Sequence, residues 1–126
     1  MIKCTAFQMK DSNEALNHIK NNWEVIEDYG DYKYDHSLHT FDSGKRVLGK
    51  CKECDQLILL QESEYHSFSD KPDSYYDDYF PVSSKEEADE LNKKYDGFKI
   101  ETEFNNKWLC VTNSNSIWKN ENSNNE

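Results

Sequence analysis

Residues 45–61 read KRVLGKCKECDQLILLQ, and the architecture expected for the rest of the chain is built outward from this segment. Strand-forming apolar residues lie on both sides of a Cys-x-x-Cys sequence that runs from Cys51 to Cys54. Two such runs joined by a short turn are typical of a β-hairpin. Thiolates separated by two residues on a turn can point at one metal ion, as in a zinc knuckle. The segment therefore predicts an antiparallel hairpin with a zinc-knuckle-like turn.

The chain before the hairpin has one strong helix pattern. Residues 2–8 predict a short strand, after which Asp11 stands three residues before Glu14, as in a capping box. Apolar residues then recur at helical spacing, at Leu16, Ile19, Trp23 and Ile26. This pattern predicts a helix over 12–28. Residues 29–37 alternate tyrosines with acids and are expected to form a loop or an irregular strand.

After the hairpin the chain is expected to return to strands. The outgoing strand is expected to continue through Glu62–His66, and Ser67–Tyr76 is expected to be a polar loop. The next apolar run, Tyr79–Val82, contains Pro81. Because proline has no N–H to donate to a neighbouring strand, this run predicts a short strand at the edge of a sheet.

A second helix and a further hairpin are predicted downstream. Ser84 followed by Glu87 is typical of a helix start. Apolar residues alternate with charged ones over Phe98–Phe104, which is the period of a half-buried strand. An asparagine turn then leads into a last strand over Lys107–Thr112.

These elements predict a single small α+β domain over 1–112, with a mostly antiparallel sheet and two helices. The chain has 126 residues, and its 3 Trp, 8 Tyr and 6 Phe residues can build a compact core although only 35% of residues are hydrophobic. Residues 113–126 are rich in Asn and Ser, so we expect a disordered tail there.

The net charge of the chain indicates which classes of macromolecule it repels and which it attracts. The formal net charge is −10. Such a field repels nucleic acid, which is bound by neutralising phosphates with Lys and Arg, and it attracts basic protein surfaces. The alternative is that the charge only keeps the protein soluble. We expect no direct contact with nucleic acid.

The cysteines and histidines predict a structural zinc site. Cys51 and Cys54 supply half of a tetrahedral site, and His36 with His39 would complete a Cys₂His₂ set. The other candidate ligands are Cys4, Cys110 and His66. The alternatives are a knuckle that has lost its metal, a redox pair, or a nucleophile formed by Cys54 with His66.

An acidic and tyrosine-rich tract over 62–80 is the predicted binding surface. Tyrosine provides rigid contact area and carboxylates complement Lys and Arg on a partner. The residues that we expect to contact a partner are Glu62, Glu64, Tyr65, Asp73, Tyr75, Tyr76, Asp77, Asp78 and Tyr79. The alternative is a solvated loop with some of its tyrosines in the core.

Several classes of protein are not indicated by the sequence. It has no phosphate-binding loop, dinucleotide fingerprint, Gly-x-Ser-x-Gly elbow or His-Glu-x-x-His motif, so we expect no enzyme. No apolar run reaches the roughly 18 residues of a membrane span, and the first residues lack the long apolar stretch of a signal peptide. A cytoplasmic protein is expected.

Residues from Cys51 to Gly97 combine several short motifs. These are Cys51-x-x-Cys54, Ser63–His66, Asp78–Val82, Glu86–Leu91 and Tyr95–Gly97. The combination resembles a family of small uncharacterised proteins of low-GC Gram-positive bacteria and their phages and mobile elements. The family has no established activity, so the resemblance implies no catalytic residue. It implies a bacterial or phage setting, where small acidic proteins often act as inhibitors.

The sequence therefore predicts a non-enzymatic intracellular binding protein. We expect an acidic inhibitor, of the anti-CRISPR or toxin-immunity type, that occupies a basic surface of a nuclease or other nucleic-acid-binding protein. The alternative is a zinc-knuckle adaptor with a structural role in a larger assembly.

Overall fold

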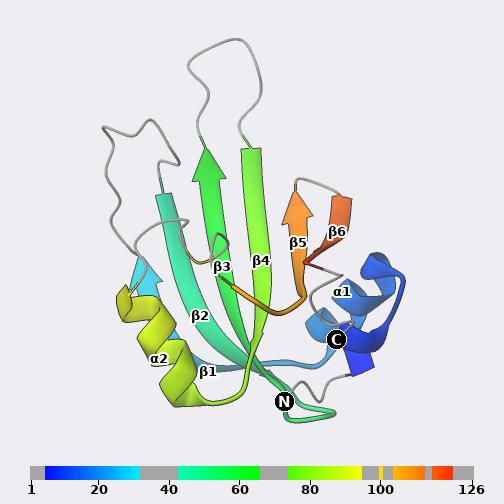
Figure 1. The fold of residues 1–126 in the computed structure, drawn as a ribbon, viewed down its shortest axis with the longest axis horizontal. Helices are drawn as coiled ribbons and strands as arrows, with labels where there is room; N and C mark the ends of the chain where they lie inside the picture. The colour runs from blue at the N-terminus through cyan, green and yellow to red at the C-terminus, as the bar shows by residue number, and fades with distance from the viewer. Residues whose placement is uncertain are drawn as a thin grey trace.

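The computed structural model describes residues 5–31, 43–65, 74–94, 100, 104–112 and 115–120. Within them the chain forms one small α+β domain around an antiparallel sheet, as predicted, with strand order β1-β2-β3-β4-β5-β6 (Figure 1). The elements are η1 (Thr5–Gln8), α1 (Ser12–Asn21), β1 (Trp23–Asp31), β2 (Ser43–Cys51), β3 (Leu57–Tyr65), β4 (Ser74–Val82), α2 (Lys85–Lys94), β5 (Trp108–Thr112) and β6 (Asn115–Lys119). Each strand pairs with the next one along the chain.

The predicted hairpin is confirmed as β2 and β3. The backbone N–H of Cys51 donates to Gln56 O at 2.9 Å, and that of Asp55 donates to Cys51 O at 2.7 Å. Asp55 closes the turn with a φ of 61°, in the left-handed region that Asp tolerates better than most residues. Beyond the turn, Gly49 pairs with Ile58 and Val47 with Leu60.

The first helix begins where predicted but ends early. The Asp11 carboxylate accepts from Asn13 N at 2.8 Å and from Glu14 N at 3.4 Å, which caps α1. The predicted helix over 12–28 is wrong beyond residue 21, because Trp23–Asp31 pairs with β2. Pairing with β2 satisfies backbone groups that a longer helix would leave exposed at a sheet edge.

Close packing explains why β1 can lie where it does. A Cβ atom added to Gly49 would lie 2.2 Å from the nearest atoms of the Trp23 ring. Glycine at this position therefore lets the indole lie directly on β2. The same ring meets Tyr79 edge-on, with centroids 6.1 Å apart. Tertiary packing of one aromatic side chain thus overrides the helical period in which Trp23 takes part.

The start of the chain is also corrected. The predicted strand over 2–8 is wrong at its described residues, since Thr5–Gln8 forms a 3₁₀ helix. Ala6 and Phe7 are buried against α1 in one apolar cluster, which a single turn of helix achieves as well as a strand would.

Strand β4 is longer and more central than expected. Ser74–Val82 lies between β3 and β5, so the polar loop predicted over 67–76 is wrong at residues 74–76, and the rest of that loop lies outside the described residues. Pro81 is tolerated because β5 pairs only with Tyr76–Tyr79. Among the described strands, Pro81 thus has a partner on β3 alone, which is the edge-like position where proline is tolerated.

The predicted strand over Phe98–Phe104 is wrong at the two residues that the structure describes. Ile100 is helical, and the N–H of Phe104 donates to Ile100 O at 2.9 Å. Both side chains are buried, and Phe104 meets Phe80 with ring centroids 4.9 Å apart. Positions four residues apart share a face in a helix and in a strand, so the apolar alternation could not distinguish them.

The expected tail contains a strand. Asn115–Lys119 forms β6 along β5, so the disorder predicted from residue 113 is wrong for this segment, while 121–126 lies outside the described residues. Trp118 of β6 contacts the N-terminal part of the domain. Its Nε1 donates to Lys10 O at 3.1 Å, and its ring lies 6.0 Å from that of Phe7.

Side chains on alternate sides of the sheet form two apolar clusters. Leu59 and Phe80 lie in the cluster beneath α2, whereas Ile58 and Tyr79 lie in the cluster beneath α1. The two helices therefore pack on opposite faces. In Figure 1 the end of β3 at Tyr65 and the end of β4 at Ser74 extend beyond both helices.

Helix α2 is fixed by its predicted start and by a buried cation. Ser84 Oγ accepts from Glu87 N at 3.1 Å, and the Glu87 carboxylate accepts from Ser83 N at 2.7 Å. The fully buried Arg46 donates to Gln61 Oε1 at 2.9 Å and to Asn92 of α2 at 3.3 Å. Arg46 therefore connects the sheet to α2 and is not part of a basic surface.

None of the helices in the described part of the chain is long and apolar enough to cross a lipid bilayer.

Replacing Trp118 with Ala should destabilise the domain, because β6 loses its contacts with Phe7 and Lys10. We expect a loss of about 2 kcal/mol in the free energy of unfolding, measured by urea titration, since the indole is only half-buried. Ile117→Ala on the same strand is the control. Ile117 is exposed, and its replacement should cost less than about 0.5 kcal/mol. Equal effects would show that Trp118 does not anchor the strand.

Candidate functional site

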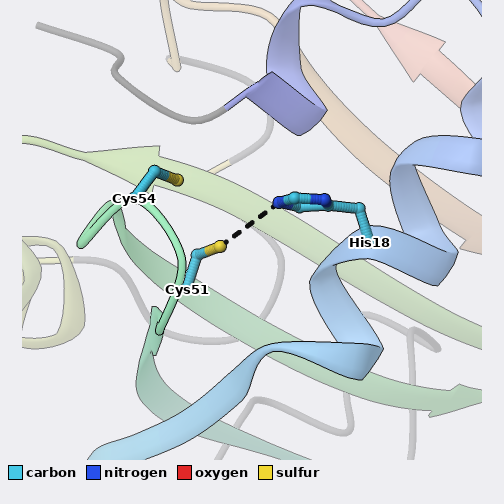
Figure 2. Close-up of side chains that lie close together, drawn as sticks. All are labelled: His18, Cys51 and Cys54. Atoms are coloured by element: carbon cyan, nitrogen blue, oxygen red, sulfur yellow. Dashed lines mark hydrogen bonds between the residues drawn. The ribbon is translucent and has the colours of Figure 1, made fainter.

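Three potential metal ligands meet at the end of the hairpin. Cys51, Cys54 and His18 present ligand atoms that all lie within 4.8 Å of one another. Figure 2 shows the His18 ring extending from its helix toward the turn that carries both cysteines. Cys51 Sγ and His18 Nε2 lie 3.4 Å apart. A helix and a hairpin thus contribute to one cluster.

The local backbone holds these side chains together. Cys51 is the last residue of β2 and is fully buried, Cys54 lies in the turn, and His18 lies in the last turn of α1. The N–H of Lys52 donates to Asn22 O at 2.7 Å, which ties the knuckle to the end of the helix. Asn22 Nδ2 in turn donates to His18 O at 2.9 Å. The cluster therefore rests on backbone contacts as well as on its own side chains.

The distances fit a zinc ion. Tetrahedral zinc with Zn–S of about 2.3 Å and Zn–N of about 2.0–2.1 Å separates sulfur from nitrogen by about 3.6 Å and two sulfurs by about 3.8 Å. The observed 3.4 Å between Cys51 and His18 is close to the first value. The largest separation in the cluster, within 4.8 Å, needs a shift of about 1 Å. Side-chain rotation alone can supply such a shift.

The structure changes the predicted ligand set. Cys51 and Cys54 lie together as expected, but His36 and His39 lie outside the described residues, as do Cys4 and His66. Cys110 is buried in the cluster beneath α2, on the opposite face of the sheet from Cys51. Among the residues whose positions are described, His18 is the histidine that joins the pair.

Sequence reasoning missed His18. It lies 33 residues before Cys51, within an amphipathic helix, and no ligand-spacing rule connects such a residue to a knuckle. Only the packing of α1 on the hairpin brings the two together.

The predicted binding residues divide between interior and surface. Asp78 and Tyr79 are only 6% and 5% exposed. The Asp78 carboxylate accepts from Trp108 Nε1 at 3.0 Å, and Tyr79 packs edge-on against Trp23. Burial raises the pKa of Asp78, and its hydrogen bonds from Trp108 and Cys110 oppose that rise. Both residues serve the interior and offer little area to a partner.

Other predicted residues lie toward the open end of β3 and β4. Tyr75 is 51% exposed, while Tyr76 is half-buried beside the cluster beneath α2. Only the backbones of Glu64 and Tyr65, within β3, are described. Asp73 lies outside the described residues.

Glu62 and Asp77 form a pair of like charges. They lie directly opposite each other on β3 and β4, and both are half-buried. Burial raises the pKa of Asp77 to about 6, and the charges of Glu62 and Asp78 add to this effect. Lys20 and Lys45 act in the other direction, and Lys45 Nζ lies 3.5 Å from Glu62 Oε2. Among the described residues, no hydrogen bond or salt bridge reaches the Asp77 carboxylate.

Comparison with protein-family models, with curated proteins and with solved structures gives no match at the significance required. Functional inference therefore rests on the geometry of this chain.

Asp77→Asn should stabilise the protein at neutral pH. The folded-state pKa of about 6 exceeds the ordinary 3.8, so the folded protein binds more protons than the unfolded chain between these values. Stability therefore falls as pH rises from about 4 to 6, and the amide removes that loss. We expect a gain of about 1 kcal/mol at pH 7.5 after solvent screening, and none at pH 3.5.

The measurement is urea unfolding at both pH values. Glu90→Gln is the control, because Glu90 is exposed on α2 and its replacement removes the same charge. A gain for Asp77→Asn that is equal at both pH values would contradict this account.

Proposed function

We propose that the protein is a non-enzymatic binding protein. An acidic surface around Glu62 and Asp77 on β3 and β4 occupies a basic surface on a partner protein. The observation that carries the proposal is the cross-strand pair of Glu62 and Asp77. Like charges directly opposite each other on antiparallel strands destabilise a sheet. A half-buried carboxylate that has a raised pKa and accepts no hydrogen bond from a described residue costs further stability. Such a cost is typical of residues placed for binding.

The contrast with the interior of the same sheet supports this reading. The buried Asp78 accepts a hydrogen bond from Trp108, and the buried Arg46 donates to Gln61 and Asn92. The fold therefore pairs its buried polar groups where they serve stability. By contrast, the half-buried Asp77 carboxylate accepts no hydrogen bond from a described residue.

Tyr75 and the net charge supply the rest of the surface. Tyr75 precedes Asp77 by two residues and is 51% exposed, so it can supply the rigid aromatic contact of an interface anchor. The charge of −10 speeds encounters with a basic surface. The contact surface that we propose comprises Glu62, Tyr75 and Asp77, and it leaves out the buried Asp78 and Tyr79.

The partner that this chemistry fits is a nuclease or another nucleic-acid-binding protein, whose groove binds anions. The family resemblance noted from the sequence points to a bacterial or phage setting. In that setting we propose an inhibitor of the anti-CRISPR or toxin-immunity type, which blocks the groove against nucleic acid.

Charge reversal at the acidic pair should slow association with the partner. A photo-crosslinker at position 75 identifies that partner in the source cells, and association rates are then measured by surface plasmon resonance between 50 and 500 mM salt. Glu62→Lys with Asp77→Lys should lower the rate about tenfold or more at low salt, and added DNA or RNA should compete.

The matched control is Glu86→Lys with Glu90→Lys on α2, which changes net charge by the same amount. If both double variants slow association equally, the net charge of the whole protein determines the association rate. In that case the surface of Glu62, Tyr75 and Asp77 is not the contact surface. An affinity that ignores salt and both variants would contradict the proposal.

A second function is favoured by the cluster of His18, Cys51 and Cys54. We propose that these residues bind zinc and that the knuckle serves as a structural element, as in a zinc-knuckle adaptor. A zinc ion there would connect the last turn of α1 to the hairpin and supply folding free energy. The fourth position would be filled by water or by one of the ligands outside the described residues, namely Cys4, His36, His39 or His66.

Purified protein should contain close to one equivalent of zinc by mass spectrometry under native conditions. Cys51→Ser and His18→Gln should each lose the metal and lower the free energy of unfolding by several kcal/mol. Cys110→Ala should retain zinc, because Cys110 lies on the other face of the sheet. Protein that is metal-free and whose melting temperature ignores added zinc would refute the site.

The fourth ligand can be found by cobalt substitution. The visible spectrum of Co²⁺ reports four-coordinate geometry with thiolate ligands. Single replacement of Cys4, His36, His39 or His66 should alter that spectrum only for the residue that coordinates the ion.

A further inference from the structure

An apolar recess lies on the face of the sheet that α1 partly covers. It is lined by Ile19, Lys20, Trp23, Leu60 and Tyr79 and has a volume of about 170 Å³. One water molecule needs only about 10–15 Å³ of such space, so the recess can hold a side chain. It exists because α1 ends at Asn21 and the chain crosses directly into β1. The sheet beyond the helix end is therefore left partly uncovered.

The acidic pair stands at one end of this recess. Leu60 pairs with Tyr79, and the next pair on the same face of β3 and β4 is Glu62 with Asp77. Successive pairs on one face are about 7 Å apart, which an extended lysine or arginine side chain can span. The pKa of Tyr79 is raised first by burial and then by the charges of Asp77 and Glu62, in agreement with this proximity.

We propose that this recess receives one lysine or arginine side chain of the partner, with its aliphatic stem against Trp23, Leu60 and Tyr79 and its cationic group at Glu62 and Asp77. The proposal rests on the proposed function and names the residue type that the acidic surface recognises. Long cationic side chains bury their stems on apolar surface and keep their charge at a polar rim.

Charge complementarity selects this occupant over others. An apolar side chain would fill the recess but leave the Asp77 carboxylate desolvated and unpaired. An anionic side chain would be repelled by both carboxylates. A cation satisfies the Asp77 carboxylate, while its aliphatic stem packs on the ring of Trp23 at the recess.

The position of Lys20 leads to an expectation about the affinity for a partner cation. It lines the recess, and its charge lowers the pKa of Asp77. In the free protein Lys20 therefore partly neutralises the acid that a partner cation would meet. Removing this internal cation should strengthen binding of an external one, and removing a lysine away from the recess should do so less.

The test is an NMR titration of the full chain with the peptide acetyl-(Gly-Lys)₃-amide. The indole N–H signals of the three tryptophans report separate sites. The Trp23 signal should shift, while the Trp108 signal should not, because that indole is buried against Asp78. The same peptide with N-acetylated lysines keeps the stems and loses the charge, and it should not shift Trp23.

Variants complete the test. Asp77→Asn should weaken the peptide about fivefold, and Lys20→Gln should strengthen it about twofold to fivefold. Lys93→Gln on α2 is the control for net charge and should have a smaller effect. The proposal that the recess binds a cationic side chain would be overturned by a Trp23 signal that does not shift. It would also be overturned if Lys20→Gln weakened binding of the peptide.

Failure of the recess is distinguishable from failure of the proposed function. Peptide binding that depends on Asp77 but leaves Trp23 unchanged would refute the recess and keep the acidic contact surface. Binding that is independent of Asp77 would refute both.

Discussion

The register of the β2–β3 hairpin is the constraint on which the rest of the structure depends. Successive side chains of a strand point to opposite faces, so a slip of one residue would exchange the two faces. The hydrogen bond between Cys51 N and Gln56 O and the turn at Asp55 set this register. It directs Leu59 toward α2 and Ile58 toward α1. The same register brings Cys51 to His18 and sets Lys45 opposite Glu62.

One helix connects the two candidate sites. His18, Ile19 and Lys20 are consecutive residues at the end of α1. His18 reaches the cysteines, Ile19 is fully buried in the core, and Lys20 lines the recess beside the acidic pair. A metal ion at the knuckle would therefore hold the helix end that shapes the recess. The proposed zinc site and the proposed binding surface are thus two consequences of the same packing of α1 on the hairpin.

The distribution of polar groups separates stability from function in this sheet. Arg46 and Asp78 are buried and hydrogen-bonded, and they connect the sheet to α2 and β5. Asp77 adjoins Asp78 in β4 but faces the other side of the sheet, where it lies opposite the like-charged Glu62 of β3. The sheet thus contains two kinds of carboxylate, one buried and hydrogen-bonded and one half-buried beside a like charge. Only their environments distinguish them.

The sequence by itself determined the α+β class, the hairpin with its Cys-x-x-Cys turn, and the starts of both helices at Asp11 and Ser84, because these depend on local turn chemistry and capping. The end of α1, the helical turn at Ile100 and the strand at Asn115–Lys119 were decided by tertiary structure. Trp23 joins a strand because its ring fits over Gly49, and no local pattern records that contact. The same holds for the sites. Cys51, Cys54 and the acidic tract could be read from the chain, whereas His18 and the burial of Asp78 and Tyr79 depend on residues far apart in sequence that meet only when the sheet and helices pack.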